Sequence, residues 1–126
     1  MKLIWIRAGD DGESHLEELD LPIETAGNSA VTALIPALRT GFGFLNVSEA
    51  QGWHQAPRRQ MVTVLEGALE IECGDGSTAR FHAGDAFIAD DLAGNGHLTR
   101  YPEGPVRLQY VHLPDDFDFS RWSTGG

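Results

Sequence analysis

The feature that most constrains the fold is a series of short, closely spaced strand-like runs between Gln60 and Leu113. The runs span residues 60–65, 68–73, 78–81, 86–89, 97–101 and 106–113. Turn-forming residues separate them, such as the Gly74-Asp75-Gly76 stretch and the Pro102 to Pro105 stretch. No long helical pattern interrupts the series, so the sequence predicts an all-β sandwich or barrel.

The alternation also predicts which side chains are buried. In residues 68–73, Leu69, Ile71 and Cys73 share one face, and two glutamates occupy the other. Cys73 is therefore expected to be a buried core thiol, since no adjacent cation would make it a reactive nucleophile. A single cysteine excludes an internal disulfide and fits a reducing cytoplasm.

The N-terminal third is less regular. Residues 1–8 alternate like a strand, whereas residues 14–19 fit either one helical turn or a strand. Residues 25–39 are rich in loop-forming residues. We expect residues 1–40 to form an arm that wraps over a barrel of residues 41–113, with residues 114–126 as a tail.

The net charge excludes several partners. The chain carries 19 acidic and 9 basic residues, a formal net charge of −10. Such a surface repels phosphate backbones and anionic lipids, so neither nucleic acid nor membrane is an expected partner. No apolar run is long enough to span a bilayer, and a cytoplasmic location is expected.

Three side chains suggest a metal site. His54 and Gln60 lie on one stretch and His97 on a distant one, and a barrel would bring the two stretches together. Two imidazoles and one amide oxygen are plausible but incomplete ligands for a divalent ion. The alternative is that these groups are polar contacts in a metal-free binding cavity.

The same residues resemble the two motifs of the cupin superfamily. In the first motif, G-x5-H-x-H-x3–4-E-x6-G, His54 takes the first histidine position and Gly67 the closing glycine. Ala56 stands in the second histidine position and Gln60 in the glutamate position. In the second motif His97 matches the metal-ligand histidine. The resemblance covers roughly residues 41–113.

The resemblance implies a cupin-type jelly-roll, an antiparallel β-barrel with an N-terminal arm, and a homodimer. It also implies a divalent ion, whether iron, zinc, manganese or nickel. The implied function is a metal-dependent isomerase, lyase or dioxygenase acting on a small carboxylate-bearing or hydroxylated molecule. A non-catalytic small-molecule-binding protein is the alternative. Because Gln60 is neutral, a bound ion would keep its whole charge and depend on water or an anionic ligand.

Further candidates surround this site. Arg58 is expected to hold a substrate carboxylate if it turns inward, or to be solvated if it does not. Arg59 is expected to point outward into solvent. Asp91, with Asp90 beside it, is a candidate general acid or base, an orienting group for His97, or a turn cap. The parity of Tyr110 and His112 in the last strand stays open.

Overall fold

The computed structural model describes residues 1–45 and 51–125. In these residues the chain forms ten strands and one short 3-10 helix, which confirms the predicted all-β class. The elements are β1 (Lys2–Ala8), β2 (Ser14–Asp20), β3 (Ile23–Ala26), β4 (Ser29–Thr32), β5 (Arg39–Leu45), β6 (Gln51–His54), β7 (Gln60–Cys73), β8 (Thr78–His82), β9 (Ala86–Asp90), β10 (His97–His112) and η1 (Phe119–Trp122).

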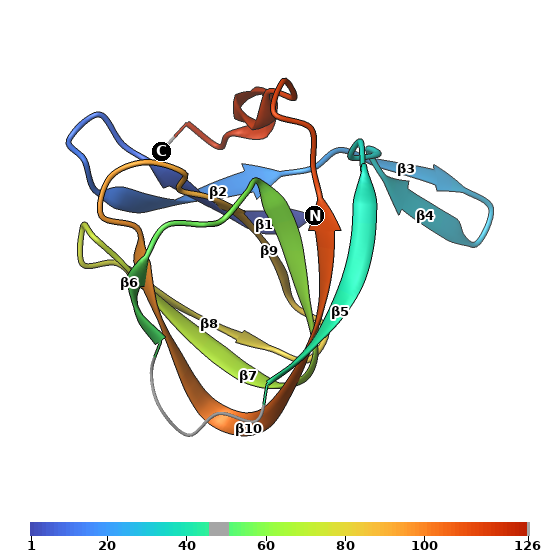
Figure 1. The fold of residues 1–126 in the computed structure, drawn as a ribbon. Helices are drawn as coiled ribbons and strands as arrows, with labels where there is room; N and C mark the ends of the chain where they lie inside the picture. Colours follow the sequence, from blue (N-terminus) through green and yellow to red (C-terminus); the bar gives the residue numbers. More distant parts are fainter. Residues whose placement is uncertain (46–50, 126) are drawn as a thin grey trace.

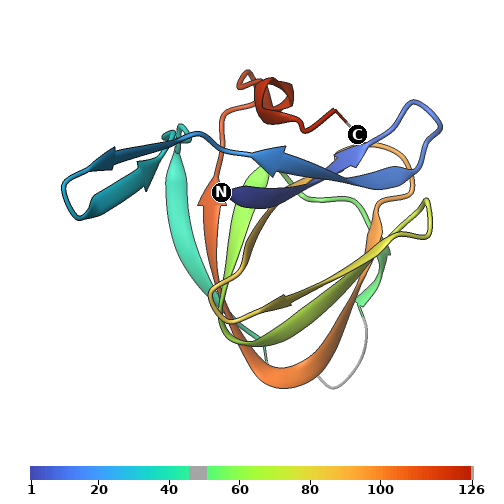
Figure 2. The same cartoon turned by 180° about the vertical axis from the view of Figure 1, so that it is seen from behind.

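Two long bent strands, β7 and β10, organise the fold into two layers (Figure 1). The first layer runs β2-β1-β9-β7-β10-β5 and uses the start of β7 and the end of β10. The second layer contains β8, the end of β7, the start of β10, and β6. Both views show the strands curving around a common interior (Figures 1 and 2).

The bend in β7 lies at Gly67, where the sequence predicts a strand end. Gly67 has a φ of +80°, a conformation that side chains rarely adopt, and a Cβ there would be 2.5 Å from the Pro105 carbonyl oxygen. The bulge shifts the alternation by one residue. Val62 and Val64 face the interior before it, and Leu69 and Ile71 after it. The inward prediction for Leu69, Ile71 and Cys73 is confirmed.

β10 contains the corresponding bend. The sequence predicts a sharp turn at residues 102–105 between two strands, and this is wrong, since one continuous strand spans the region. Its pairing with β7 shifts at three points between Arg100 and Leu108. Bulges therefore absorb the prolines without ending the strand.

The N-terminal residues contribute two strands to the main sheet. β1 pairs antiparallel with β2 and parallel with β9, so the sheet is mixed rather than purely antiparallel. For residues 14–19 the strand alternative is correct. Residues 25–39 are not all loop, because β3 and β4 pair as a hairpin. This hairpin projects from the body of the molecule (Figures 1 and 2).

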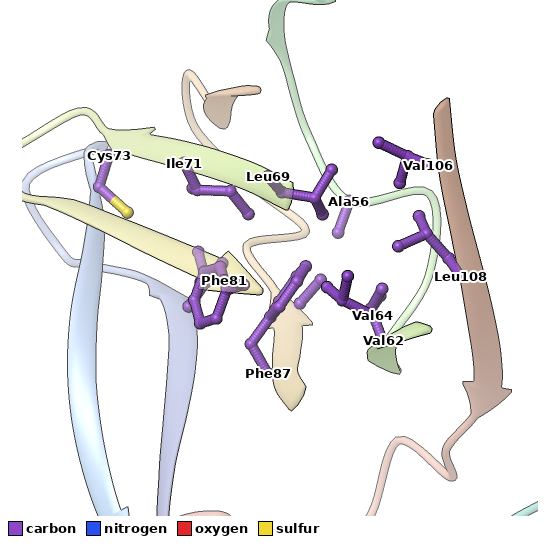
Figure 3. Packing of buried hydrophobic residues seen from close by; sticks show 12 residues of the cluster. Ala56, Val62, Val64, Leu69, Ile71, Cys73, Phe81, Phe87, Val106 and Leu108 are labelled. Atoms are coloured by element: carbon purple, nitrogen blue, oxygen red, sulfur yellow. The ribbon is translucent and has the colours of Figure 1, made fainter. Parts of the chain in front are cut away.

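Two apolar clusters cover the two faces of the first layer. The inner cluster fills the space between the layers, and Figure 3 shows its side chains converging from β7, β8, β9 and β10. Phe81 and Phe87 pack against each other there, with ring centroids 4.5 Å apart and ring planes tilted by 34°. The outer cluster is closed by the C-terminal tail, whose Phe119 is fully buried. No helix among the described residues has the length and hydrophobicity to cross a membrane.

Candidate functional site

A cavity of about 800 Å³ lies between the two layers. Its volume is in the range of small-molecule sites. Strands of both layers and the segment between β6 and β7 line it. The lining residues are Arg39, Thr40, Gly41, Phe42, Leu45, His54, Gln55, Ala56, Pro57, Arg58, Gln60, Val62, Leu69, Ile71, Phe87, Ala89, His97, Thr99, Tyr101, Leu108, Tyr110 and His112.

The two motif histidines face each other across this cavity wall. His54 ends β6, His97 begins β10, and the two are direct partners in the antiparallel register. Their ring centroids are 4.6 Å apart. Gly96 makes this approach possible, since it has a φ of +74° and any side chain there would collide with the His54 carbonyl. The glycine before His97 therefore brings the two predicted ligand stretches together.

Both imidazoles are oriented by an oxygen on their Nδ1 side. The His54 Nδ1 lies 2.8 Å from the Gly52 carbonyl oxygen. A carbonyl only accepts, so Nδ1 donates, and in the neutral ring Nε2 carries the free lone pair. The His97 Nδ1 lies 2.5 Å from Asp91 Oδ2. An ionised Asp91 imposes the same tautomer on His97.

Asp91 lies behind His97 rather than in the cavity. Its side chain is fully buried, and Oδ1 has no hydrogen-bond partner in the described part of the chain. A buried carboxylate needs a nearby positive charge, because desolvation strongly disfavours an isolated anion. His97 supplies that charge if it is protonated, and a cation bound at its Nε2 would do the same.

Gln60 lies at the polar end of the cavity. It begins β7, is 9% exposed, and pairs in register with His112 of β10 and Ala89 of β9. His112 in turn pairs with Arg39 of β5. Arg39, His112 and Gln60 therefore form one polar row across three strands, and all three line the cavity.

Two histidines and one amide are an incomplete set of protein ligands for a divalent ion. Outside residues 46–50 and 126, no group of three or more His, Cys, Asp or Glu side chains could hold a metal. An ion would depend on His54, His97 and the Gln60 amide oxygen, completed by ligands from solution. The carbonyl and carboxylate on the two Nδ1 atoms are the outer contacts that metal-binding histidines usually have.

The cavity lining is basic, although the protein as a whole is acidic. The chain has 19 acidic and 9 basic residues, yet the described cavity lining has no Asp or Glu. It has two arginines, Arg39 and Arg58, and three of the five histidines in the chain. Arg58 is exposed and lies at the cavity. Such a lining favours an anionic ligand.

Two phenols give the lining a neutral, partly apolar region. Tyr101 and Tyr110 are half-buried, and burial raises the pKa of both hydroxyls above the ordinary value. Both are protonated at neutral pH. Tyr110 and His112 do line the cavity, which answers the parity question that the sequence leaves open.

Arg59 and Asp90 belong to the opposite face of the sheet. The expectation that Arg59 is solvated is wrong, since it is 9% exposed and lies 3.0 Å from Asp90. Its guanidinium also donates to the carbonyls of Pro114 and Phe117 in the tail. Asp90 additionally accepts a hydrogen bond from the Trp5 indole at 2.9 Å.

Sequence reasoning did not find Arg39 or the open backbone at Gly41. The signal available was the alternation in residues 39–45, where Arg39, Gly41 and Gly43 share one face and Phe42 and Phe44 the other. Alternation alone does not say which of the two faces points inward.

Comparisons with known proteins give limited similarity. The sequence matches no family model and no curated protein. A 3,4-ketoisomerase from Helicobacter canadensis is a similar solved structure, with 13% identity, a TM-score of 0.49, and coverage of 86% of this chain and 88% of the other. Protein NMB1881 from Neisseria meningitidis aligns at 14% identity with a TM-score of 0.44, covering 74% and 82% of the two chains.

These similarities concern the course of the backbone over most of the chain. At such identities and TM-scores they say nothing about the ligand or reaction. The chemistry of the site therefore rests on its own residues.

Proposed function

We propose that the chain is a metal-dependent enzyme of the cupin type that acts on a small anionic molecule in the central cavity. The carrying observation is the facing pair His54 and His97, each with Nδ1 occupied and Nε2 left available. The basic lining of the cavity in an acidic protein supports the anionic substrate.

His54, His97 and Gln60 would hold the ion, and when bound it would polarise a substrate oxygen as a Lewis acid. Asp91 acts as a positioning residue, because it fixes the ring of His97 and increases its basicity from behind. The Gly52 carbonyl does the same for His54. Gln60 would add a neutral oxygen ligand. The positive charge of the ion would then be left for an anionic substrate to neutralise.

Arg58 and Arg39 would bind the substrate carboxylate at the cavity. A guanidinium matches a carboxylate with two parallel hydrogen bonds, which fixes orientation as well as charge. Arg39 stands in the same row as His112 and Gln60, so a carboxylate held there lies beside the imidazole of His112.

His112 is the proposed proton-transfer group. It faces the cavity, unlike Asp91, and an imidazole has one nitrogen that can accept a proton and one that can donate it. A proton moved by His112 next to a carbonyl or carboxylate suits isomerisation or elimination, the leading reaction types. Dioxygenation is the type expected if the ion is iron.

A non-catalytic binding protein is the second candidate. One observation favours it: the described cavity lining contains no carboxylate that could act as a general base. His112 carries that role alone in the enzyme proposal. A protein that binds anions and metal but moves no substrate proton would have this second function.

The metal proposal is tested with two adjacent aspartates. Asp91→Asn keeps the size of the side chain but removes the charge behind His97, so metal affinity should fall by about 10- to 100-fold. Asp90→Asn is the matched control, since Asp90 contacts Arg59 and Trp5 on the other face. It should lower stability and leave metal affinity unchanged. Metal content by elemental analysis and metal titration are the readouts.

The histidine variants complete this test. His54→Ala and His97→Ala should abolish metal retention while circular dichroism still reports a β-rich fold. Gln60→Glu should tighten metal binding and weaken binding of small carboxylates. Unchanged metal content in both histidine variants would contradict the metal proposal. The chain would then be a metal-free protein with a small-molecule binding cavity.

Turnover is tested by solvent exchange. Metal-loaded protein is incubated in D₂O with a panel of small carboxylates, and NMR follows deuterium incorporation while an electrode follows oxygen uptake. Wild type should exchange at least one panel member, and His112→Asn should lose this exchange. Binding without exchange or oxygen uptake would favour the non-catalytic function.

The proposed partner is a second copy of the chain. Among the described residues, six of the ten exposed large apolar side chains lie within residues 23–44. Every residue of β3, and all but one of β4, is exposed, and an isolated two-stranded hairpin is marginally stable in water. β5 is an edge strand whose Phe42 and Phe44 are exposed, and Phe42 also borders the cavity. A homodimer would cover both the hairpin and this edge.

A further inference from the structure

The inner face of β5 carries two glycines where a cavity wall would normally carry side chains. The space in front of Gly43 is filled by the side chain of Tyr110 on the neighbouring strand, because a Cβ at Gly43 would lie 2.6 Å from Cε2 of Tyr110. Gly41 is different, since nothing lies within 4 Å of the position of its Cβ. Gly41 is exposed and lines the cavity, so this part of the cavity wall is bare backbone with open space in front of it.

This open space is bordered by apolar and aromatic groups. Gly41 pairs with Tyr110, Tyr110 with Val62, and Val62 with Phe87, which makes one row across four strands. Leu69 and Leu108 add to the cavity lining and, like Val62 and Phe87, are buried. The only hydroxyl in the row is the Tyr110 phenol.

The polar row lies beside it. Arg39, His112 and Gln60 are each two residues along their strands from Gly41, Tyr110 and Val62. Two residues of extended chain span roughly 6.6 Å. A ligand that reaches both rows therefore needs a charged end and an apolar body only a few ångströms apart.

The shape of the apolar part is also restricted. Gly41 leaves bare backbone at this part of the wall, and the Tyr110 ring lies against the neighbouring Gly43 of the same strand. A flat ligand can contact such a surface over its whole face, and a pair of aromatic rings is more favourable than the area that it buries alone would give. A puckered ring of the same size loses much of this contact.

We propose that the ligand is a carboxylate with a flat, aromatic body, bound with its ring over Gly41 beside Tyr110 and its carboxylate at the row of Arg39, His112 and Gln60. The carboxylate end rests on the proposed function. The aromatic end rests on the open space at Gly41 and the apolar row around it.

Three probe ligands separate charge from shape. Acetate has the carboxylate alone, benzoate adds a flat ring, and cyclohexanecarboxylate adds a puckered ring with the same number of carbons. In NMR or calorimetric titrations, benzoate should bind at least about tenfold more tightly than acetate, because the ring leaves water. It should bind about three- to tenfold more tightly than cyclohexanecarboxylate.

A glycine variant locates the ring. Gly41→Ala places a methyl group in the open space and should lower benzoate affinity about tenfold while acetate affinity stays within about twofold. Alanine meets no atom there, so the fold should be kept, which thermal unfolding checks. The control on the same strand is Phe44→Leu, whose outward side chain should leave both affinities unchanged.

A second glycine variant acts through the tyrosine. Gly43→Ala drives a methyl group against the Tyr110 ring, so it should lower the preference for benzoate over cyclohexanecarboxylate. Because the comparison between probes in the wild type needs no variant, it remains decisive if a variant fails to fold.

The titrations are run with chelator-treated and with metal-loaded protein. The proposal of an aromatic ligand would be overturned if benzoate bound no more tightly than the other two probes. It would also be overturned if the Gly41→Ala variant kept the full affinity for benzoate. Equal losses of acetate and benzoate in Gly41→Ala would overturn it as well. A protein that holds no metal but still prefers benzoate would refute the metal proposal and leave this inference standing.

Discussion

Asp90 and Asp91 are adjacent in the chain but act on opposite faces of the first layer. Asp90 binds Arg59 and Trp5 on the outer face, and Asp91 binds His97 on the inner side. The sequence presents both as equal candidates for an orienting role. It could not separate them, because the partners of each come from distant segments and are assigned only when the strands pair.

The environment of Cys73, in contrast, could be predicted from the residues beside it in the sequence. Its parity with Leu69 and Ile71 indicates burial, and it is 1% exposed. Burial raises the pKa of its thiol from 9.0 to about 11. The thiol therefore carries its proton throughout the physiological range.

We expect Cys73 to react slowly with a thiol reagent in the native protein and rapidly in denaturant. Between about pH 9 and 11 the unfolded chain loses the thiol proton and the native protein keeps it. The free energy of unfolding should therefore fall as pH rises, by at most about 1.4 kcal/mol per pH unit from this group. Below pH 9 the contribution is constant.

Urea unfolding of wild type and Cys73→Ala at pH 8, 9 and 10 measures this difference. The buried tyrosines titrate in both proteins, so their contribution cancels in the comparison. Equal pH slopes for the two proteins would show that the thiol is not held protonated by the fold.

At the scale of elements, the tail depends on a single side chain of the loop before β7. Arg59 donates to the carbonyls of Pro114, Asp115 and Phe117, and its guanidinium lies 4.7 Å from the centre of the Phe119 ring. The same loop carries Arg58 and leads to Gln60. One loop therefore contacts both the tail, through Arg59, and the candidate site, through Arg58.

We expect Arg59→Ala to lower the free energy of unfolding by about 3 kcal/mol, because it leaves the largely buried carboxylate of Asp90 without its cationic partner. Arg58→Ala is the neighbouring control, and its exposed side chain should change stability by less than about 0.5 kcal/mol. Limited proteolysis should cleave residues 114–125 faster in Arg59→Ala only. Equal stability of the two variants would contradict this role.

The strands themselves were predictable from alternation, and their ends were not. Gly67 and the prolines of residues 102–105 carry the residue types that normally end strands. Here they form bulges, because the two long strands bend together and keep their pairing on both sides of the bend. Whether a turn residue ends or bends a strand depends on the strand beside it, and that strand lies far away in the sequence.

At the scale of the whole molecule, the described residues form a cavity between the two layers and expose an apolar region within residues 23–44. The paired histidine stretches were predictable from their spacing. The basic character of the cavity beside them was not, because Arg39 and His112 come from strands whose inward faces alternation alone does not identify. The exposed apolar region around β3, β4 and β5 follows from the same arrangement.

We expect the protein to be a dimer by light scattering after size exclusion, and Phe42→Ser with Phe44→Ser to halve the measured mass. Both side chains are more than 60% exposed and lie on the edge strand β5. Leu92→Ser, an exposed apolar side chain outside this region, should leave the mass unchanged. A monomeric wild type would contradict the proposed interface.

The parallel pairing of β1 with β9 has a consequence for biosynthesis. Ile4 of β1 pairs with Phe87 of β9. β1 is therefore synthesised long before its partner strand β9 leaves the ribosome. Until then the nascent β1–β2 hairpin has an unpaired edge that other chains can bind. Folds dominated by such distant pairings acquire their structure slowly. Production of this protein should therefore benefit from slower translation and from chaperones that protect nascent strands.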